Sequence, residues 1–244
     1  PTRIKLDQAV WKDNSNISIV ATPSVGTEHL DIDFLKSKGV KVISLTGESE
    51  LTKTIYSPAE LAFAHLLNIT RNFNSAVNSV KEGKWSTNGL MGRELNGKTL
   101  GIIGFGSVGS NMSKYSKAFG LNIIAYDPVK TISDPDIQQV SCIYYLYNKS
   151  DIISIHASYN PSTHHLITYN SFLKMKKSCI FINTSRGEIV EEKALIRALN
   201  ENIIYAAGID VIENESSTED DCCIESKLNT YRCINNLYVT PHIG

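Results

Sequence analysis

One glycine-rich turn between two apolar runs constrains the fold of this chain more than any other feature. Residues 104–109 read Gly-Phe-Gly-Ser-Val-Gly and follow the apolar run at 100–103, and a second apolar run at 122–126 ends at Asp127. A strand, a glycine turn, a helix, a second strand and an acidic residue form, in this order, a dinucleotide-binding βαβ pattern. The turn predicts an α/β fold, and the flanking strands and the acid weigh against the alternative of a purely structural turn.

Each glycine of the turn has its own expected role. Gly104 lets the chain turn off the strand, Gly106 leaves room for the backbone to approach a pyrophosphate, and Gly109 lets the next helix pack against the sheet. That helix, expected from about 108 to 119, would point its unpaired N–H groups and its positive dipole end at the phosphates.

The acidic residue after the second apolar run indicates which dinucleotide is bound. The carboxylate of Asp127 can accept hydrogen bonds from the adenosine ribose hydroxyls and would repel a 2′-phosphate. NAD is therefore favoured over NADP, a preference that the nearby Lys130 weakens slightly. A nicotinamide cofactor limits the chemistry mostly to hydride transfer.

Composition argues against several other classes of protein. With 244 residues and a formal net charge of −1, the chain has room for one large or two small domains and carries no basic footprint for nucleic acid or a membrane surface. No apolar run reaches the length of a membrane span, and the first residues do not resemble a signal peptide. None of the five cysteines forms a C-x-x-C pair, and adjacent Cys222 and Cys223 are expected to be loop thiols. We therefore expect a reducing, cytoplasmic setting and no metal site.

Strand and helix signals alternate along the chain. Ser57 is expected at the N-cap of a long helix, with Pro58 at its first position and Glu60 at the capping-box position. The alternation predicts a parallel sheet with right-handed crossovers, in two α/β blocks joined by this helix. Loops are expected at 81–97 and, as a solvated acidic segment, at 213–221. The other expected strands cover 17–21, 40–44, 152–156, 179–183, 205–210 and 237–240, and the other helices 30–38, 170–175 and 191–200.

Three expected strand ends carry polar residues, in segments 183–187, 208–215 and 240–244. In open α/β sheets, ligands bind beyond the carboxyl ends of the strands. In the first segment, the guanidinium of Arg186 could hold a carboxylate through two parallel hydrogen bonds, and the alternative is an ordinary salt bridge. In the last segment, His242 follows Thr-Pro, where an acid/base group would be useful, and the alternative is a hydrogen-bonded loop histidine.

As a set, these motifs resemble those of the D-isomer-specific 2-hydroxyacid dehydrogenase family, which includes phosphoglycerate dehydrogenases and glyoxylate/hydroxypyruvate reductases. The resemblance covers nearly the whole chain and implies an oxidoreductase with a Rossmann-type doubly wound parallel sheet and a smaller, incomplete flavodoxin-like α/β substrate domain. The segments that carry it are 25–27, 59–60, 83–85, 97–104, 126–128, 150–151, 175–176, 185–187 and 240–242.

The resemblance assigns roles to matching residues. Arg186 would bind the substrate carboxylate and polarise the 2-oxo group, and His242 would give the proton in reduction and remove it in oxidation. Glu215 would pair with His242; it is chosen over Glu213 because the family's glutamate stands five residues after the aspartate, which is Asp210 here. Asp210 would face the nicotinamide end of the cofactor.

Further cofactor contacts are implied at the turn and after a later strand. Ser107 and Val108 would offer backbone N–H groups to the pyrophosphate, and Thr184 and Ser185 would line the nicotinamide ribose. The chain departs from the family pattern at Ser158 and Ser216, where the family often has proline. Both residues are expected in loops.

The same resemblance implies the domain organisation and the partners. Residues 1–56 would form a partial substrate domain, in which Val25 and Gly26 contribute backbone donors to the substrate carboxylate, and residues 57–244 would form the NAD-binding domain. The chain is thus expected to be shortened at both ends. Its partners would be a small 2-oxo or 2-hydroxy acid and a second copy, in a homodimer formed through the long helix.

Two other interpretations stay open from the sequence. Transcriptional corepressors share this fold and these catalytic positions, so the chain could be a non-catalytic NAD(H)-sensing interaction protein, although no nuclear-localisation-like basic run favours this. Alternatively, it could be a folded fragment that binds NAD without enclosing a substrate. His65, on the long helix, is expected to be a packing or dimer-surface residue.

Overall fold

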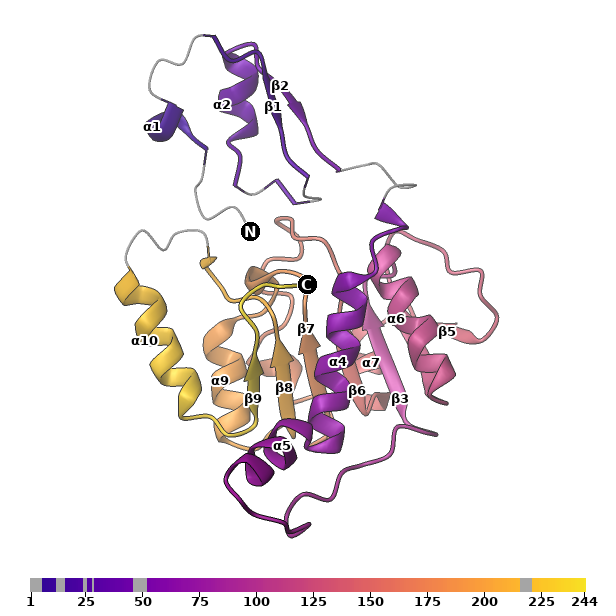
Figure 1. Cartoon of the computed structure of the whole chain (residues 1–244). Coiled ribbons are helices and arrows are strands. Elements are labelled where there is room, and N and C mark those ends of the chain that lie inside the picture. Colours follow the sequence, from indigo (N-terminus) through magenta and orange to yellow (C-terminus); the bar gives the residue numbers. More distant parts are fainter. Residues whose placement is uncertain (1–5, 12–15, 24–25, 28, 46–51, 216–220) are drawn as a thin grey trace.

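A seven-stranded parallel sheet forms the centre of the computed structural model, which describes residues 6–11, 16–23, 26–27, 29–45, 52–215 and 221–244, with the backbone alone at 221–223 (Figure 1). Its strand order is β5-β4-β3-β6-β7-β8-β9, and every neighbouring pair is parallel. The chain reverses its direction of travel across the sheet between β3 and β6, which is the usual ligand-binding point of a doubly wound sheet. The strands are β3 (Thr99–Ile103), β4 (Asn122–Tyr126), β5 (Ile137–Gln139), β6 (Ile152–Ile155), β7 (Ile180–Asn183), β8 (Ala206–Ile209) and β9 (Leu237–Val239).

Helices cover both faces of this sheet, and each face has its own apolar core. On one face, α4 (Ser57–Arg71) and α6 (Ser107–Ala118) pack Leu66 and Met112 against Leu100 and Ile102 of β3. On the other face, α7 (Ile143–Lys149), α8 (Tyr169–Phe172) and α9 (Glu192–Asn200) pack against side chains such as Ile103. Successive strand residues thus enter opposite cores, as the two-residue period of a strand requires. The predicted Rossmann-type α/β fold is confirmed.

A smaller α/β unit lies above the carboxyl edge of the large sheet in Figure 1. Strands β1 (Ile19–Ala21) and β2 (Lys41–Ile43) pair in parallel, and α2 (Ile32–Ser37) buries Leu35 against them. Trp11, at the end of α1 (Gln8–Trp11), joins the same small core. Gly39, with φ of +73°, ends α2 in the left-handed conformation that glycine adopts without strain.

The long helix begins one residue earlier than expected and is followed by a separate helix. Tyr56, not Ser57, is the N-cap of α4, so the predicted N-cap is wrong by one residue. Tyr56 makes no side-chain capping bond, so the predicted capping box is not formed. Pro58 remains in the first turn, where its missing N–H costs little. At the other end, Asn72 takes a φ of +50° and turns the chain into a separate helix, α5 (Phe73–Lys81).

Among the elements not expected from the sequence, three belong to the large domain's sheet or flank it. They are β5 and α7, which have weak or short apolar patterns, and α10 (Asp221–Arg232), which starts where the acidic segment was expected to end. Figure 1 shows α10 on the outer side of α9, and Lys227 of α10 donates to the Glu192 carboxylate at the start of α9 at 2.8 Å. The acidic segment is not entirely solvated, because Glu213 is half-buried and pairs with His165. Ser216 lies outside the described residues.

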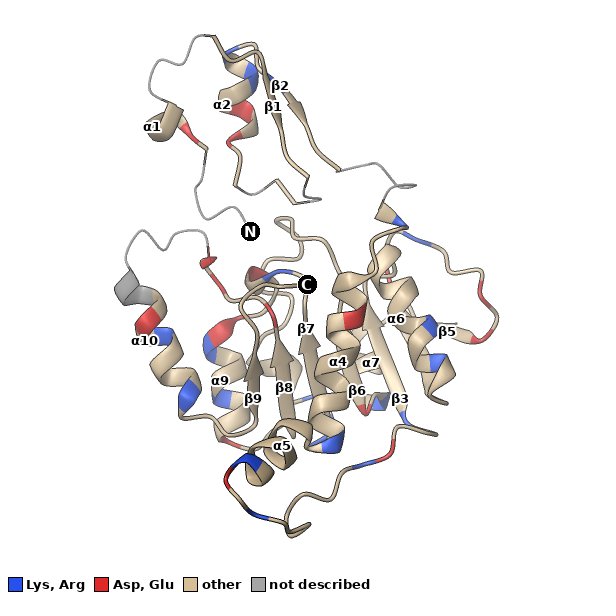
Figure 2. Ribbon diagram, in the orientation of Figure 1, with Lys and Arg blue, Asp and Glu red and all other residues tan. Residues whose placement is uncertain are grey.

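Acidic and basic residues are interspersed along the ribbon over the described part of the chain (Figure 2). Within the same residues, no helix combines the length and the apolar character needed to cross a membrane.

Candidate active site

The glycine turn after β3 is shaped by contacts that only glycine permits. Gly104 has a φ of +87°, and a Cβ there would lie 2.5 Å from the backbone nitrogen of Ala157. A Cβ on Gly109 would lie 2.3 Å from the carbonyl oxygen of Gly104, so α6 can approach β3 only without a side chain at this position. A Cβ on Gly106, in contrast, would meet no atom within 4 Å. The turn is therefore tight on its inner side and open at Gly106, where a ligand could approach the backbone.

The N-terminus of α6 opens onto this turn. The helix begins at Ser107, and its N-cap is Gly106, which has no side chain to cap the first N–H groups. The N–H groups of Ser107 and Val108 have no acceptor within the helix, as in the first turn of any α-helix. Together with the helix dipole, they form a site suited to a pyrophosphate.

Asp127 lies beside the turn, at the end of β4. Its Oδ2 accepts the N–H of Phe105 at 2.8 Å, and its Oδ1 accepts those of Val129 and Lys130 at 3.0 and 2.9 Å. Although burial alone would raise the pKa of Asp127, these backbone hydrogen bonds hold the pKa below its usual value. The carboxylate is therefore charged at neutral pH. The open turn, the helix N-terminus and this acid are the features that an NAD molecule requires, so the residues fit the cofactor.

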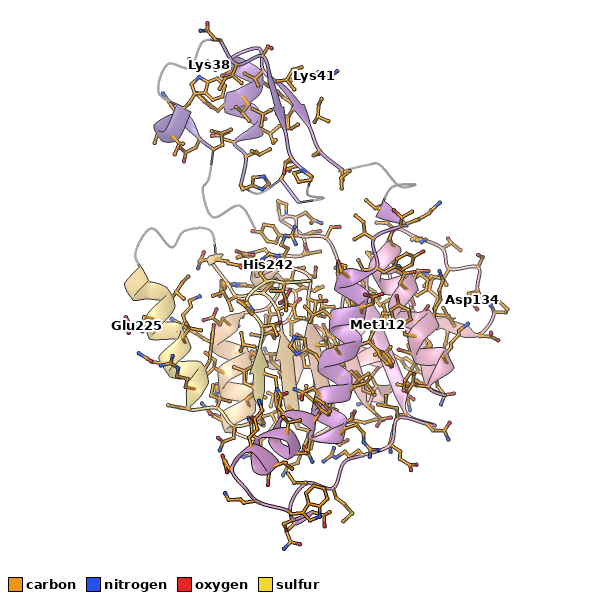
Figure 3. All side chains as sticks on the ribbon, in the orientation of Figure 1. Lys38, Lys41, Met112, Asp134, Glu225 and His242 are labelled. Atoms are coloured by element: carbon orange, nitrogen blue, oxygen red, sulfur yellow. The ribbon has the colours of Figure 1, made fainter. Side chains whose placement is uncertain are left out.

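His242 and Glu215 form an ion pair at the carboxyl edge of the sheet. Nδ1 of His242 lies 2.9 Å from Oε1 and 2.8 Å from Oε2 of Glu215. The two residues come from the loops after β9 and β8, and Figure 3 shows His242 at the edge that faces the small unit. The backbone of His242 is in the left-handed region, with φ of +54°, so the chain accepts a strained conformation at this position.

The pKa of His242 is raised above its usual value. The hydrogen bond that Nδ1–H of His242 donates to Glu215 is the main cause of the raised pKa, burial opposes it, and the charges of Glu215 and Asp210 add to it. The positive charge of Arg186 is close enough to oppose the protonation of His242. The imidazolium form is thus favoured at a half-buried position, which suits a group that delivers a proton.

Arg186 is held at the carboxyl end of β7 by the residue that ends that strand. The side chain of Asn183 accepts the N–H of Ser185 at 3.1 Å and donates to the carbonyl oxygen of Arg186 at 3.0 Å. A Cβ on Gly187 would lie 2.0 Å from the carbonyl oxygen of Ile212, so the Arg186 loop lies directly against the loop that carries Glu215. This role of Asn183 was not predicted from the sequence. A polar residue at the end of a buried strand does indicate a hydrogen-bonded side chain, because buried polar groups almost always have a partner.

The other polar residues predicted near the cofactor are bonded within the same edge. Thr184 donates its hydroxyl to the carbonyl oxygen of Pro58 at 3.3 Å, and Ser185 donates to that of Ala157. Asp210 is buried, with a relative exposure of 1%, and accepts three hydrogen bonds from the loop that contains His242. Gly26 lies half-buried in the loop after β1, and Val25 lies outside the described residues.

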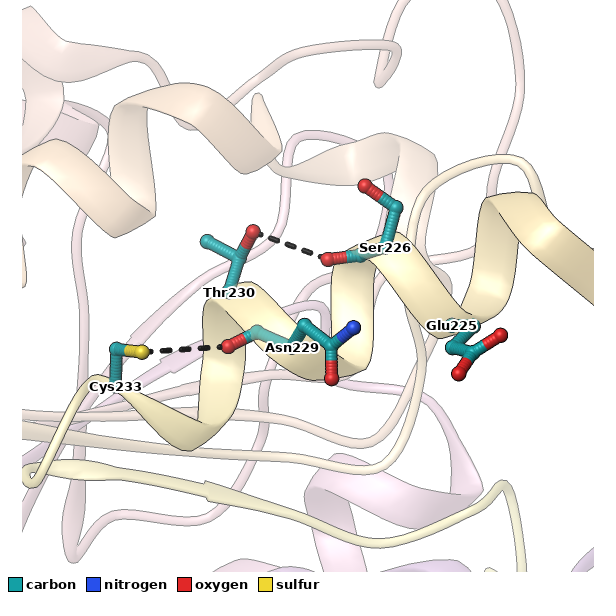
Figure 4. A pocket seen from close by; sticks show the side chains of 5 residues that line it. All are labelled: Glu225, Ser226, Asn229, Thr230 and Cys233. Carbon is teal, nitrogen blue, oxygen red and sulfur yellow. Dashed lines mark hydrogen bonds between the residues drawn. The ribbon is translucent and has the colours of Figure 1, made fainter.

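A hollow on the protein surface lies along α10 (Figure 4). Two of its polar groups bond to backbone carbonyls four residues earlier: Thr230 donates to the carbonyl oxygen of Ser226 at 3.1 Å, and the Cys233 thiol donates to that of Asn229. The remaining lining residue is Glu225. The hollow offers no converging polar groups and is not a candidate site. The described residues also contain no cluster of His, Cys, Asp and Glu able to hold a metal ion.

Comparisons with known proteins show the family of this chain and the likeness of its fold to solved structures. Residues 63–244 match the family described as "D-isomer specific 2-hydroxyacid dehydrogenase, NAD binding domain". The chain is 39% identical to a hydroxypyruvate reductase of Thermotoga maritima, over 98% of this chain and 74% of that protein. It is 34% identical to a D-3-phosphoglycerate dehydrogenase of Methanocaldococcus jannaschii, over 98% of this chain and 44% of that protein. Among solved structures, a D-lactate dehydrogenase from Aquifex aeolicus complexed with NAD and lactic acid superposes with a TM-score of 0.82 at 31% identity, covering 98% of this chain and 73% of the other.

Proposed function

The chain belongs to the D-isomer specific 2-hydroxyacid dehydrogenase family of NAD-dependent enzymes, and on this premise we propose that it transfers a hydride between NAD(H) and C2 of a D-2-hydroxy acid or its 2-oxo acid. The observation that carries the proposal is the pairing of His242 with Glu215 close to the charge of Arg186. An acid/base group and a carboxylate-binding cation are the two functions that this reaction demands of the protein.

In the reductive direction, Arg186 binds the carboxylate of the 2-oxo acid and stabilises the negative charge that develops on its carbonyl oxygen. His242 gives its proton to that oxygen from Nε2, the ring nitrogen turned away from Glu215. In oxidation, the neutral imidazole removes the hydroxyl proton. When bound, the nicotinamide supplies or accepts the hydride.

Glu215 acts on the reaction through His242. Its carboxylate accepts from Nδ1, which fixes the orientation of the ring and favours the imidazolium form that reduction needs. Asp210 faces the nicotinamide end of the cofactor in this proposal, and its negative charge also raises the pKa of His242.

The cofactor is held by the turn and by the residues around it. The backbone N–H groups of Ser107 and Val108 bind the pyrophosphate, and the open side of Gly106 allows its approach. Asp127 accepts hydrogen bonds from the adenosine ribose and selects NAD over NADP. Thr184 and Ser185 line the nicotinamide ribose.

We assign the substrate side to the small unit. Residues 1–56 form part of a substrate domain, and residues 57–244 form the NAD-binding domain, in agreement with the two separate sheets. The backbone of Val25 and Gly26 adds donors to the substrate carboxylate. The names of the relatives support a small 2-oxo acid such as hydroxypyruvate or glyoxylate.

The proposal is tested by the loss of NADH absorbance with a panel of 2-oxo acids: glyoxylate, hydroxypyruvate, pyruvate, phosphohydroxypyruvate and a branched-chain acid. Turnover with one of them supports the dehydrogenase function and identifies the substrate side chain. No turnover across the panel, combined with an NADH-dependent rise in Tm, would reject it in favour of a cofactor-sensing role or a chain that cannot enclose substrate.

We also propose a homodimer, supported by an ordered loop that holds apolar side chains in solvent. Trp85 and Met91 are 92% and 89% exposed. Their loop is nevertheless fixed to α4, because the N–H of Arg93 donates to the carbonyl oxygen of Thr70 at 2.7 Å and the Asn72 side chain donates to that of Met91 at 3.0 Å. Large apolar side chains on a fixed loop are typical of an interface. The measurement is the molar mass in solution by light scattering, with Trp85→Ser as the variant expected to weaken association.

The cysteines support a reducing, cytoplasmic setting. Cys142 and Cys233 are exposed free thiols, and Cys179 is a buried free thiol whose pKa is raised by burial. Free exposed thiols persist in reducing compartments and tend to oxidise elsewhere. The side chains of Cys222 and Cys223 lie outside the described residues.

A further inference from the structure

A chain of hydrogen bonds joins the middle of α4 to the loop that carries His242. Nε2 of His65 lies 3.0 Å from Oγ1 of Thr240, and this hydroxyl donates to Oδ1 of Asp210 at 2.6 Å. His65 and Asp210 are only 5% and 1% exposed. The chain therefore crosses from a helix on one face of the sheet to a carboxylate at its carboxyl edge, with both ends buried and Thr240 half-buried between them.

The direction of each hydrogen bond follows from the number of protons available. An ionised carboxylate only accepts, so the single proton of the Thr240 hydroxyl is given to Asp210. The Thr240 oxygen must then accept from His65, which places a proton on Nε2 of His65. Burial lowers the pKa of His65 and Asp210 opposes this shift, so the ring is the neutral Nε2–H tautomer at neutral pH.

The backbone around His65 is shaped to admit this ring. A Cβ on Gly208 would lie 2.8 Å from Cβ and 2.9 Å from Cγ of His65, so β8 needs a glycine where the imidazole passes. The ring is thus held between helix and strand, and little rotational freedom is lost when it donates to Thr240.

Asp210 links the Thr240 hydroxyl to backbone groups farther along the loop 240–244. Besides the Thr240 hydroxyl, it accepts the N–H of Ile243 at 3.0 Å and that of Gly244 at 2.9 Å. These donors stand on both sides of His242, whose left-handed backbone would otherwise relax. Removing one bond of this set leaves a buried carboxylate short of a donor, which is costly.

We propose that His65 is a positioning residue of the reaction: through the Thr240 hydroxyl it fixes Asp210 and the loop 240–244, and so holds His242 against Glu215 at the nicotinamide end of the site. The inference rests on the proposed roles of His242 and Asp210. His65 touches neither substrate nor cofactor in this proposal and acts only through Thr240.

The test compares two variants that break the chain with two that keep it. His65→Leu removes the donor and Thr240→Val removes the hydroxyl, whereas His65→Gln and Thr240→Ser each retain a hydrogen-bonding group. For each full-length variant, Kd is measured calorimetrically for NADH and for ADP-ribose, which shares the adenosine and pyrophosphate but lacks nicotinamide. kcat and KM for the 2-oxo acid found active, and Tm, complete the set.

We expect His65→Leu and Thr240→Val to weaken NADH binding about five- to tenfold and to lower kcat about tenfold, with KM and the affinity for ADP-ribose within twofold of the parent. Thr240→Ser and His65→Gln should recover most of both losses. The double variant should be no worse than the poorer single variant, because both changes break one chain.

The inference would be overturned if His65→Leu and Thr240→Val both kept the parent's ratio of NADH affinity to ADP-ribose affinity. Additive losses in the double variant would also overturn it. If His65→Leu does not fold, the same ratio of affinities, measured in Thr240→Val and Thr240→Ser, tests the inference. The affinity ratio is measured without turnover. If the chain is inactive with every 2-oxo acid, that result counts against the proposed function, and the binding measurements still test the role of His65.

Discussion

Nδ1 of His242 faces both carboxylate oxygens of Glu215, at 2.9 and 2.8 Å, so the opposite ring nitrogen is the one directed away from the carboxylate. The histidine is supplied by the loop after β9 and the glutamate by the loop after β8, which are adjacent strands of the sheet. Two loops fixed by one sheet edge can hold this pair more rigidly than a single loop could.

The first prediction concerns the pH dependence that this pair creates. Reduction needs the imidazolium of His242, whose raised pKa keeps it protonated above its ordinary range near pH 6.5. Glu215→Gln removes the main cause of that shift, so the alkaline limit of reductive kcat/KM should move to lower pH. At pH 8 the loss should be about tenfold or more.

The matched control is Glu213→Gln. Glu213 pairs with His165 at 2.6 Å and stands only two residues before Glu215. Rate–pH profiles of the two variants should differ, with the alkaline limit unchanged in Glu213→Gln. The same displacement in both variants would contradict the assignment of Glu215.

The second prediction concerns the carboxylate-binding cation. Arg186→Lys keeps the charge but loses the planar pair of donors, so kcat/KM for the 2-oxo acid should fall by about 100-fold or more, and Arg186→Ala should lose at least as much. The affinity for NADH, measured by fluorescence titration, should stay within a fewfold of the parent. Parental turnover by Arg186→Lys would remove Arg186 from the site.

Local sequence patterns predicted the βαβ unit and the polar strand ends, because each depends on a few adjacent residues. The strand ends meet at one edge simply because all the strands are parallel. The contacts of His65 with Thr240 could not be predicted in this way, since they join residues distant in the sequence and depend on how α4 packs. The helix α10 could not be predicted for the same reason: it lacks a strong apolar pattern, and its contact with α9 through Lys227 joins residues distant in the sequence.

The third prediction separates two glycines of the turn. Gly106→Ala adds a methyl group to open space, so the free energy of unfolding should change by less than about 1 kcal/mol while NADH binding weakens about tenfold or more. Gly109→Ala forces a Cβ to within 2.3 Å of a backbone oxygen, and stability should fall by about 2 kcal/mol or more. Urea unfolding and NADH titration of both variants check this contrast. Equal stability losses would show that Gly106 is structural.

The fourth prediction concerns the choice between NAD and NADP. Asp127→Asn keeps one of the two accepting oxygens but removes the charge that would repel a 2′-phosphate. The ammonium of Lys130 lies beside the same turn and donates to the carbonyl oxygen of Phe105 at 2.9 Å. The ratio of NADPH to NADH affinity should therefore rise about tenfold. Asp134→Asn, which breaks an exposed pair with Lys117 elsewhere, is the control and should leave the ratio unchanged.

The last prediction follows from a half-buried histidine directly after β6, His156, whose ring nitrogen Nδ1 is buried. Nε2 of His156 lies 2.8 Å from the hydroxyl oxygen of Ser154, and its Nδ1 is buried with no partner among the described residues. Burial lowers the pKa of His156 to about 3. The unfolded chain takes up a proton near pH 6.5, which the folded chain does not do until about pH 3. The stability that His156 contributes is thus present above pH 6.5 and is lost progressively as the pH falls toward 3.

His156→Gln removes this titration. Between pH 7 and pH 5, the parent should lose about 2 kcal/mol more unfolding free energy than the variant, because each pH unit below 6.5 costs about 1.4 kcal/mol at one such site. Urea unfolding at pH 5, 6, 7 and 8 measures the difference. Between pH 7 and 8 the two proteins should change in parallel, since the histidine is neutral in both states there. Parallel curves down to pH 5 would mean that His156 becomes protonated in the folded chain, and that its surroundings at the end of β6 admit water.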